Sequence, residues 1–336
     1  MLMLKTQVDK KSGLCVVTGA AGHIGNTLVR LLLEDGGKVR ACLHNDTLSL
    51  GGIGKTRIDI LDHKSMSKAF KGADTVFHCA AMIAISRNHI RQMNEINIRG
   101  TENVVAACRE AGVRRLVHFS SIHAISPYPE GKQVDETKPS VCSGEGMPYD
   151  YSKAMSEEAV LAGVSKGLDA VIVNPTGVIG PWDWKPSFMG NFVLSICSGK
   201  IPFLVNGGFN WVDVRDVAMG AVLAGRFGKT GQRYILGNQW ISVQDLAQML
   251  GEISQNMKKR PKVPHWLAHV GVPFFGIMSW FSKKQPLFTH DSLATLLHHR
   301  DVSWEKASRE LTYSPRPIKE TLADTVNWFR DNGYHD

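Results

Sequence analysis

The sequence predicts an α/β fold built on a doubly wound parallel sheet, with a smaller, mostly C-terminal α/β region attached to it. Three observations support this prediction. Short β-rich runs alternate with helical runs, a glycine-rich turn joins the first run of each kind, and the pattern changes after Pro175. Strands that alternate with helices form parallel sheets through right-handed crossovers. With 336 residues, of which 43% are hydrophobic, the chain can bury one large core or two modest ones.

The expected elements follow one another in a regular order. The apolar run 14–18 forms the first expected strand, and the amphipathic run 25–34 forms the first expected helix. Stretches rich in Trp, Pro and Gly at 180–188 and 200–210 end the alternation, and a helical tail stops near Arg330. The other strands and helices are expected at 38–44, 65–70, 75–79, 94–110, 116–120, 151–164 and 170–173.

A glycine-rich turn follows the first expected strand. Glycines at such a turn permit a tight bend, the approach of backbone N–H groups to a phosphate, and close packing of the helix on the strand. Because a strand precedes this turn and a helix follows it, we expect it to bind the pyrophosphate of a dinucleotide, as in a Rossmann fold. The candidate contacts are Gly19, Ala21, Gly22, His23, Ile24 and Gly25.

We expect the chain to form two regions, one that binds the dinucleotide and one that binds the substrate. Residues 13–175, joined by about 209–238, are expected to form a dinucleotide-binding domain. Residues 176–208 and 239–331, where the alternation is lost, are expected to form the substrate-binding region.

The end of the second expected strand bears on the choice of cofactor. An acidic residue there would bind the ribose 2′-hydroxyl of NAD, but this chain has His44. Asp46 is a second candidate for that role, whereas His44 with Lys55 or Arg57 could bind the 2′-phosphate of NADP. The sequence therefore slightly favours NADP and leaves NAD open. The residues expected at the adenine are Asp59 and Ile60, although Asp59 is also typical of a turn or helix cap.

Tyr149 and Lys153 are candidate catalytic residues. They stand four residues apart at the start of an expected helix, so both side chains emerge on one face. A nearby ammonium and a cationic nicotinamide would stabilise the phenolate and lower its pKa from about 10, which lets the phenol exchange a proton with an alcohol or carbonyl. Ser121 follows a strand, where ligands of parallel sheets bind, and could orient the reacting oxygen. Tyr151 has Met155 four residues later, which leaves Tyr149 as the candidate.

Composition argues against nucleic-acid-binding, metal-binding and disulfide-bonded classes of protein. Lys and Arg exceed Asp and Glu by 39 − 31 = 8, but the charge is scattered and no nucleic-acid reader motif accompanies it, so nucleic-acid binding is not expected. No set of His, Cys, Asp and Glu has ligand spacing, so no metal is expected. The six cysteines include no C-x-x-C pair, which predicts buried free thiols in a reducing cytoplasm.

Two segments bear on targeting. Residues 1–13 lack the apolar core of a secretory signal. The apolar stretch 266–281 is interrupted by His269 and is shorter than the roughly 20 residues that cross a bilayer, so we expect a buried or lid helix and no stable membrane insertion.

The motifs together resemble the extended short-chain dehydrogenase/reductase family, within the NAD-dependent epimerase/dehydratase superfamily. The resemblance runs from about Leu14 to Arg330. The segments 174–176 and 306–317 look like the dihydroflavonol-reductase and 3β-hydroxysteroid-dehydrogenase-like branch. The other matching segments are 18–25, 59–62, 78–81, 97–101, 120–121, 149–153, 177–181 and 211–218.

The resemblance implies a role for each residue of the site. Tyr149 would be the acid/base, Lys153 would lower its pKa and hold the nicotinamide ribose, and Ser121 would position the reacting oxygen. Asn97 would support the site, and two chains would pair as a homodimer. Reductases of this branch usually carry arginine where His44 stands, so the chain departs from the pattern there. The resemblance places Ala80, Ala81, Pro175 and Val178 beside the cofactor.

The aromatic residues Trp182, Trp184, Phe188 and Trp211 predict an apolar pocket, although such residues are as often ordinary core. The predicted function is therefore NAD(P)-dependent interconversion of an alcohol and a carbonyl on a fairly apolar small molecule. A nucleotide-sugar epimerase or dehydratase with tightly bound NAD is the alternative, and a catalytically silent nucleotide sensor is a third. The candidate substrate contacts are Ile83, His123, Thr176, Trp182 and Trp211.

Overall fold

The computed structural model describes residues 13–48, 50–51, 53–84, 89–257, 260–263, 296 and 298–334. The stretch 266–281, expected to be a buried or lid helix, lies outside these residues, as do residues 1–12. Within the described part, no helix combines the length and the apolar character needed to cross a membrane.

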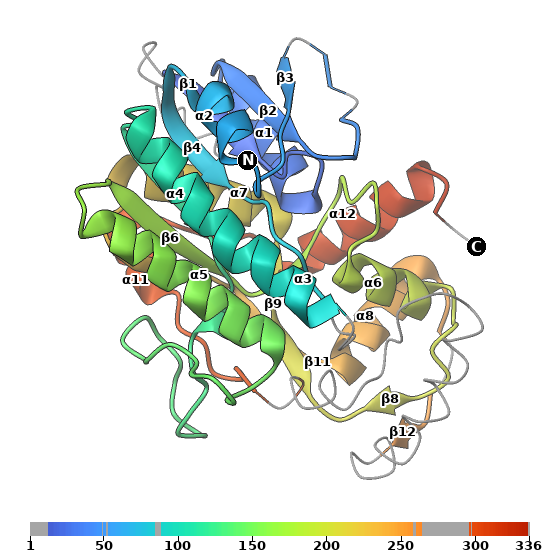
Figure 1. Ribbon diagram of the computed structural model, residues 1–336. Helices are drawn as coiled ribbons and strands as arrows, with labels where there is room; N and C mark the ends of the chain where they lie inside the picture. The colour runs from blue at the N-terminus through green and yellow to red at the C-terminus, as the bar shows by residue number, and fades with distance from the viewer. Residues whose placement is uncertain are drawn as a thin grey trace.

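A parallel sheet forms the centre of the molecule (Figure 1). Its strands lie in the order β10-β6-β5-β4-β1-β2-β3, and every neighbouring pair is parallel. The order reverses between β1 and β4, and ligands of such sheets bind beyond the carboxyl ends of the strands at that point. The doubly wound fold is therefore confirmed. The strands are β1 (Leu14–Thr18), β2 (Val39–Leu43), β3 (Gly54–Arg57), β4 (Ala73–His78), β5 (Arg115–Phe119), β6 (Ala170–Pro175) and β10 (Arg233–Leu236).

Helices cover both faces of this sheet. Val16 and Val17 are neighbours on β1 and point to opposite faces, and both are fully buried because each face is covered. Val17 packs in the cluster that contains Leu28 of α1, and Val16 packs with Phe70 of α2. The helices on the first face are α1 (His23–Glu34), α7 (Val214–Phe227) and α11 (Glu305–Leu311), and those on the second are α2 (His63–Phe70), α4 (Gly100–Glu110) and α5 (Pro148–Val164).

α5 and the helix expected at 94–110 differ most from the sequence expectation. α5 begins at Pro148, ahead of the expected residue 151, because proline suits the first helical position and the Asp150 carboxylate accepts the Met147 N–H at 2.9 Å. Tyr149 therefore lies inside the first turn. The expected helix 94–110 is divided into α3 (Ile90–Asn94), a π-helical turn (Glu95–Arg99) and α4.

A second group of elements lies beside the carboxyl end of the central sheet (Figure 1). The expected segment 209–238 is divided: α7 and β10 pack with the central sheet, whereas β9 pairs with β7 and β11. Trp211 of β9 and Leu246 of α8 belong to the core of this second group. Its elements are β7 (Gly177–Ile179), α6 (Phe188–Cys197), β8 (Leu204–Val205), β9 (Gly208–Asp213), β11 (Gln239–Ser242), α8 (Val243–Ser254), β12 (Lys262–Val263) and α12 (Ile318–Asp331).

The cysteines are free thiols, but they are not all buried as the sequence predicts. Cys42 and Cys108 are buried against the central sheet. Cys142 is exposed, because it lies in the irregular connection that precedes α5.

Candidate active site

The turn between β1 and α1 has the geometry of a phosphate cradle. Gly19 has φ +64°, and a Cβ there would lie 2.7 Å from the Ala80 nitrogen. A Cβ on Gly25 would lie 2.2 Å from the Gly19 oxygen. Gly22 occupies the N-cap of α1 and has no side chain to cap it, so first-turn N–H groups remain available to an anion. The turn therefore fits the pyrophosphate of a dinucleotide.

The loop that follows β7 crosses the N-terminus of α1. His23 Nε2 lies 3.0 Å from the Pro181 carbonyl oxygen. Lys185 Nζ lies 3.1 Å from Asp46 Oδ1, so the carboxylate that could bind a ribose hydroxyl is engaged by a cation. Trp182, at φ +66°, belongs to this loop and stacks under the Arg30 guanidinium at 5.4 Å.

The expected adenine end lies at the carboxyl ends of β2 and β3. His44 is exposed, and the Arg57 guanidinium donates a hydrogen bond to its carbonyl oxygen. Asp59 is exposed as well, and its carboxylate accepts a backbone N–H two residues further on at 2.9 Å, which is the turn role that the sequence also allowed. Ile60 packs close to Gly100, where a Cβ would lie 2.7 Å from the Ile60 Cδ1 atom.

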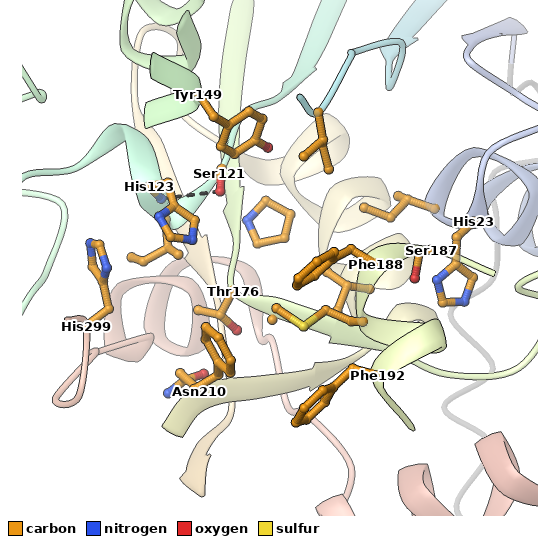
Figure 2. Close-up of a pocket in the computed structure, with 18 of the residues that line it drawn as sticks. His23, Ser121, His123, Tyr149, Thr176, Ser187, Phe188, Phe192, Asn210 and His299 are labelled. Carbon is orange, nitrogen blue, oxygen red and sulfur yellow. Dashed lines mark hydrogen bonds between the residues drawn. The ribbon is translucent and has the colours of Figure 1, made fainter. Parts of the chain in front are cut away.

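A cavity of about 440 Å³ lies where the carboxyl ends of the central strands meet the second group of elements (Figure 2). Most of the residues that the sequence singled out share its wall. They are Gly19, Gly22, His23, Ile24, Gly25, Ala81, Ile83, Ser121, His123, Tyr149, Lys153, Pro175, Thr176 and Val178. The candidates that lie off this wall are Ala21, His44, Asp59, Ile60, Ala80, Trp182 and Trp211.

Tyr149 and Ser121 meet at one end of the cavity. Figure 2 shows the Tyr149 ring directed into the cavity from α5, with Ser121 and His123 beside it. Ser121 Oγ accepts the His123 backbone N–H at 3.2 Å. Lys153 is 2% exposed, and its Nζ donates to the Phe119 carbonyl oxygen at 2.7 Å.

The environment changes the acidity of both Tyr149 and Lys153. Burial raises the pKa of Tyr149 to about 12, against the Ser121 hydroxyl and with a further contribution from Asp150. Burial lowers the pKa of Lys153 to about 8, against the attraction of Glu157. The sequence predicts a lowered pKa for Tyr149. The protein groups by themselves raise it, because loss of hydration outweighs the local hydrogen bond.

Asn97 holds the loop after β4 against α5. Its Oδ1 accepts the Met82 N–H at 2.8 Å, and its Nδ2 donates to the Met82 oxygen at 2.9 Å and to Ser152 Oγ at 3.0 Å. Ser152 lies directly before Lys153, so this network fixes the turn of α5 that carries the ammonium.

A group of imidazoles borders the cavity next to Tyr149. His123 Nδ1 lies 3.2 Å from Asp150 Oδ1, and the rings of His123 and His299 are 5.4 Å apart. His299 Nε2 lies 3.1 Å from the Ile125 oxygen, and burial together with His123 lowers the pKa of His299 to about 4. Among the described residues no set of His, Cys, Asp and Glu is arranged to hold a metal ion.

The remaining wall of the cavity is mostly apolar. Phe188 lies on it as the sequence predicts, whereas Trp184 is 48% exposed and lies off it. Trp211 is fully buried and stacks on Phe192 at 6.2 Å, so the ring predicted to contact a substrate does not line this cavity. Other wall residues that the sequence did not indicate are Met147, Met189, Phe192, Ile201, Phe203, Leu204, Val205, Phe209, Asn210, Val243, Leu296, His298 and His299.

Comparison with known proteins agrees with this architecture. Residues 15–237 match the NAD dependent epimerase/dehydratase family. The chain is 32% identical over 326 residues to Sterol demethylase protein B of Methylococcus capsulatus, which covers 95% of this chain and 98% of that relative. It is also 34% identical to a Synechocystis sp. protein provisionally named dihydroflavonol 4-reductase. That match extends over 333 residues and covers 95% of each chain.

A solved structure also matches. The crystal structure of gox2253 superposes with a TM-score of 0.84 at 32% identity, over 96% of this chain and 99% of that one. The segment that matches the family includes the glycine turn, Ser121, Tyr149 and Lys153. This protein is therefore an enzyme of the NAD dependent epimerase/dehydratase family, an extended short-chain dehydrogenase/reductase.

Proposed function

We propose that this enzyme interconverts an alcohol and a carbonyl on a fairly apolar small molecule, with a nicotinamide dinucleotide as its redox partner. One observation carries the proposal: Tyr149 and Ser121 face one end of a cavity whose remaining wall is mostly aromatic and aliphatic. Two relatives have names that refer to a sterol and a dihydroflavonol, which are ring compounds of this kind.

The chain supplies binding, orientation and proton transfer. Ser121 Oγ and the Tyr149 oxygen bind the reacting oxygen. Tyr149 takes the proton of the alcohol as the phenolate in oxidation and donates it to the carbonyl oxygen as the phenol in reduction. The Lys153 ammonium stabilises the phenolate and binds the nicotinamide ribose. When bound, the dinucleotide accepts or supplies the hydride.

The apolar wall selects the substrate and keeps water from the reacting atoms. Each Å² of apolar surface removed from water contributes about 25 cal/mol to the free energy of binding. Contact with Phe188 and Phe209 can therefore bind an aliphatic ring without polar partners. A sugar would bury hydroxyls there against carbon atoms, which is costly. This wall therefore favours an oxidoreductase with an apolar substrate over a nucleotide-sugar epimerase.

We also propose NADP as the slightly favoured cofactor. The Arg57 guanidinium lies against the His44 carbonyl oxygen, at the strand end where a 2′-phosphate would bind. Asp46, the carboxylate that could bind a 2′-hydroxyl, is paired with Lys185. A 2′-phosphate at this position would meet the Arg57 guanidinium. A ribose 2′-hydroxyl would instead compete with Lys185 for the Asp46 carboxylate.

The test begins with the purified protein, whose ultraviolet spectrum shows whether a dinucleotide is retained. NADPH and NADH are then titrated separately by nicotinamide fluorescence, and apolar cyclic ketones are added to the complex that forms. Reversible binding followed by oxidation of the reduced cofactor supports the proposal. Tightly retained NAD that is not released during turnover would favour the epimerase or dehydratase, and binding of neither dinucleotide would overturn the proposal.

A further inference from the structure

A buried carboxylate lies one helical turn beyond Lys153 on α5. Glu157 is 0% exposed. Its Oε1 accepts a hydrogen bond from Asn174 Nδ2 at 2.6 Å, and its Oε2 lies 2.6 Å from Arg233 Nε. A buried charge is costly unless it is paired and hydrogen-bonded, and these partners from β6 and β10 meet that requirement.

The same carboxylate is connected to the residue that orients the reacting oxygen. Asn174 Nδ2 donates to the Ser121 carbonyl oxygen at 2.9 Å as well as to Glu157. An amide nitrogen carries two hydrogens, so Asn174 serves both acceptors at once. Glu157 thereby fixes the orientation of the amide that holds the backbone of Ser121.

Glu157 also contributes to the electrostatic surroundings of Lys153, where it opposes the effect of burial. Burial, assisted by the Lys153 charge, lowers the pKa of His78 to about 3, and burial likewise lowers the pKa of His118, so both imidazoles are neutral. Burial raises the pKa of the Cys79 thiol, which is therefore neutral too. Glu157 makes the largest contribution that raises the pKa of Lys153, ahead of Cys79. Burial raises the pKa of Glu157 as well, and the Arg233 charge most strongly opposes that shift.

We propose that Glu157 is a positioning residue of the active site: its buried carboxylate keeps Lys153 protonated and, through Asn174, holds Ser121 in place. The inference rests on the proposed function, because it concerns the ammonium that would bind the nicotinamide ribose. Glu157 therefore acts on the active site in addition to being part of the buried core.

The variant that tests this is Glu157→Gln, which keeps the shape of the side chain and removes its charge. Its matched control is Glu158→Gln, an equal change of charge at the adjacent, exposed position. Lys153 is titrated by competitive acetylation with acetic anhydride across a pH series, followed by mass spectrometry of the peptide that contains it. NADPH affinity is measured over the same series.

We expect Glu157→Gln to move the Lys153 titration to lower pH by about one unit, a roughly ten-fold change in the protonation constant, and to move the loss of NADPH affinity with it. Glu158→Gln leaves both midpoints in place. A purely structural Glu157 would lower the temperature of unfolding without moving either midpoint. An unchanged Lys153 midpoint in Glu157→Gln overturns the inference.

A second variant keeps the test decisive if Glu157→Gln fails to fold. Arg233→Gln removes the cation that most favours the ionised carboxylate of Glu157, so Glu157 takes up a proton and the Lys153 midpoint should fall, as in Glu157→Gln. A midpoint that stays or rises contradicts the inference. Because acetylation needs no cofactor, it reports on Glu157 even if the wild-type protein binds no dinucleotide, which would be a failure of the proposed function alone.

Discussion

Tyr149, Ser121 and Lys153 are positioned by short-range features of the chain. Pro148 and the Asp150 carboxylate begin α5 so that Tyr149 lies in its first turn. Ser121 caps the short turn after β5 through the His123 N–H. Sequence spacing could indicate these residues because the distances involved span only a few positions along one helix or one turn.

Other parts of the cavity wall could not be found in this way. His299 meets Ile125 across a sequence separation of 174 residues, and no local pattern marks that contact. Thr176 was a candidate, but Asn210, which lies beside it in Figure 2, was not. Asn210 stands within a run of buried residues on β9, so its access to the cavity depends on how β9 pairs with β7.

The lowered pKa of Lys153 predicts a pH dependence at this scale. With a pKa of about 8, the ammonium is present below that pH and is lost as the pH rises through it. Dinucleotide affinity and the rate of hydride transfer should both fall above about pH 8. Lys153→Met should weaken both at neutral pH and abolish this alkaline limb, as measured by fluorescence titration and single-turnover kinetics. A variant that lost affinity but kept the wild-type limb would show that another group titrates.

At the scale of elements, the glycine turn was predictable because strand, turn and helix are continuous in the sequence. β1, the turn and α1 form one local unit whose glycine positions follow from close backbone approach. β8 and β12 are short, and they pair across a long stretch of chain. In the π-helical turn at Glu95–Arg99, Asn97 makes two hydrogen bonds with Met82 in the loop after β4. Pairings of this kind leave no periodic signal.

The glycine turn carries a second prediction. In Gly25→Ala the new Cβ would lie 2.2 Å from the Gly19 oxygen, so the turn must open. We expect a loss of about 1–3 kcal/mol in the free energy of unfolding, as for other overpacked sites, together with a large loss of dinucleotide affinity. Gly51→Ala is the control, because no atom of the described residues lies within 4 Å of a Cβ there. Chemical denaturation and fluorescence titration measure the two effects, and wild-type affinity in Gly25→Ala would refute the phosphate role of the turn.

At the scale of the whole molecule, the cavity is shared between the central sheet and the second group of elements. α5 contributes Tyr149 and the turn after β5 contributes Ser121, whereas α6, β8 and β9 contribute apolar side chains. The loss of alternation after Pro175 was enough to predict a second region. It was not enough to decide which aromatic rings face the cavity, since Trp211 and Phe209 lie two residues apart on β9 and only Phe209 lines it.

Because the two parts line different regions of the cavity, substitutions in them should have separate effects on substrate binding and on dinucleotide binding. Phe188→Ala removes a ring from the wall at the start of α6. It should raise KM for an apolar ketone by about ten-fold, which corresponds to roughly 1.5 kcal/mol of lost burial, and leave the dinucleotide Kd unchanged. Trp184→Ala, which removes an exposed ring away from the cavity, should alter neither constant. Steady-state kinetics with equilibrium titration decides, and a change in dinucleotide Kd of similar size in Phe188→Ala would argue against a separate substrate wall.

The most direct test of the whole account compares binding and turnover in Tyr149→Phe, which keeps the ring and removes the phenolic oxygen. Tyr151→Phe is the control, since Tyr151 has Met155 where Tyr149 has Lys153. We expect Tyr149→Phe to bind the dinucleotide with wild-type affinity and to lose turnover by at least about 100-fold, the usual contribution of a general acid/base, while Tyr151→Phe retains its activity. Turnover of Tyr149→Phe within a few-fold of the wild type would contradict the assignment of Tyr149 as the proton-transfer group.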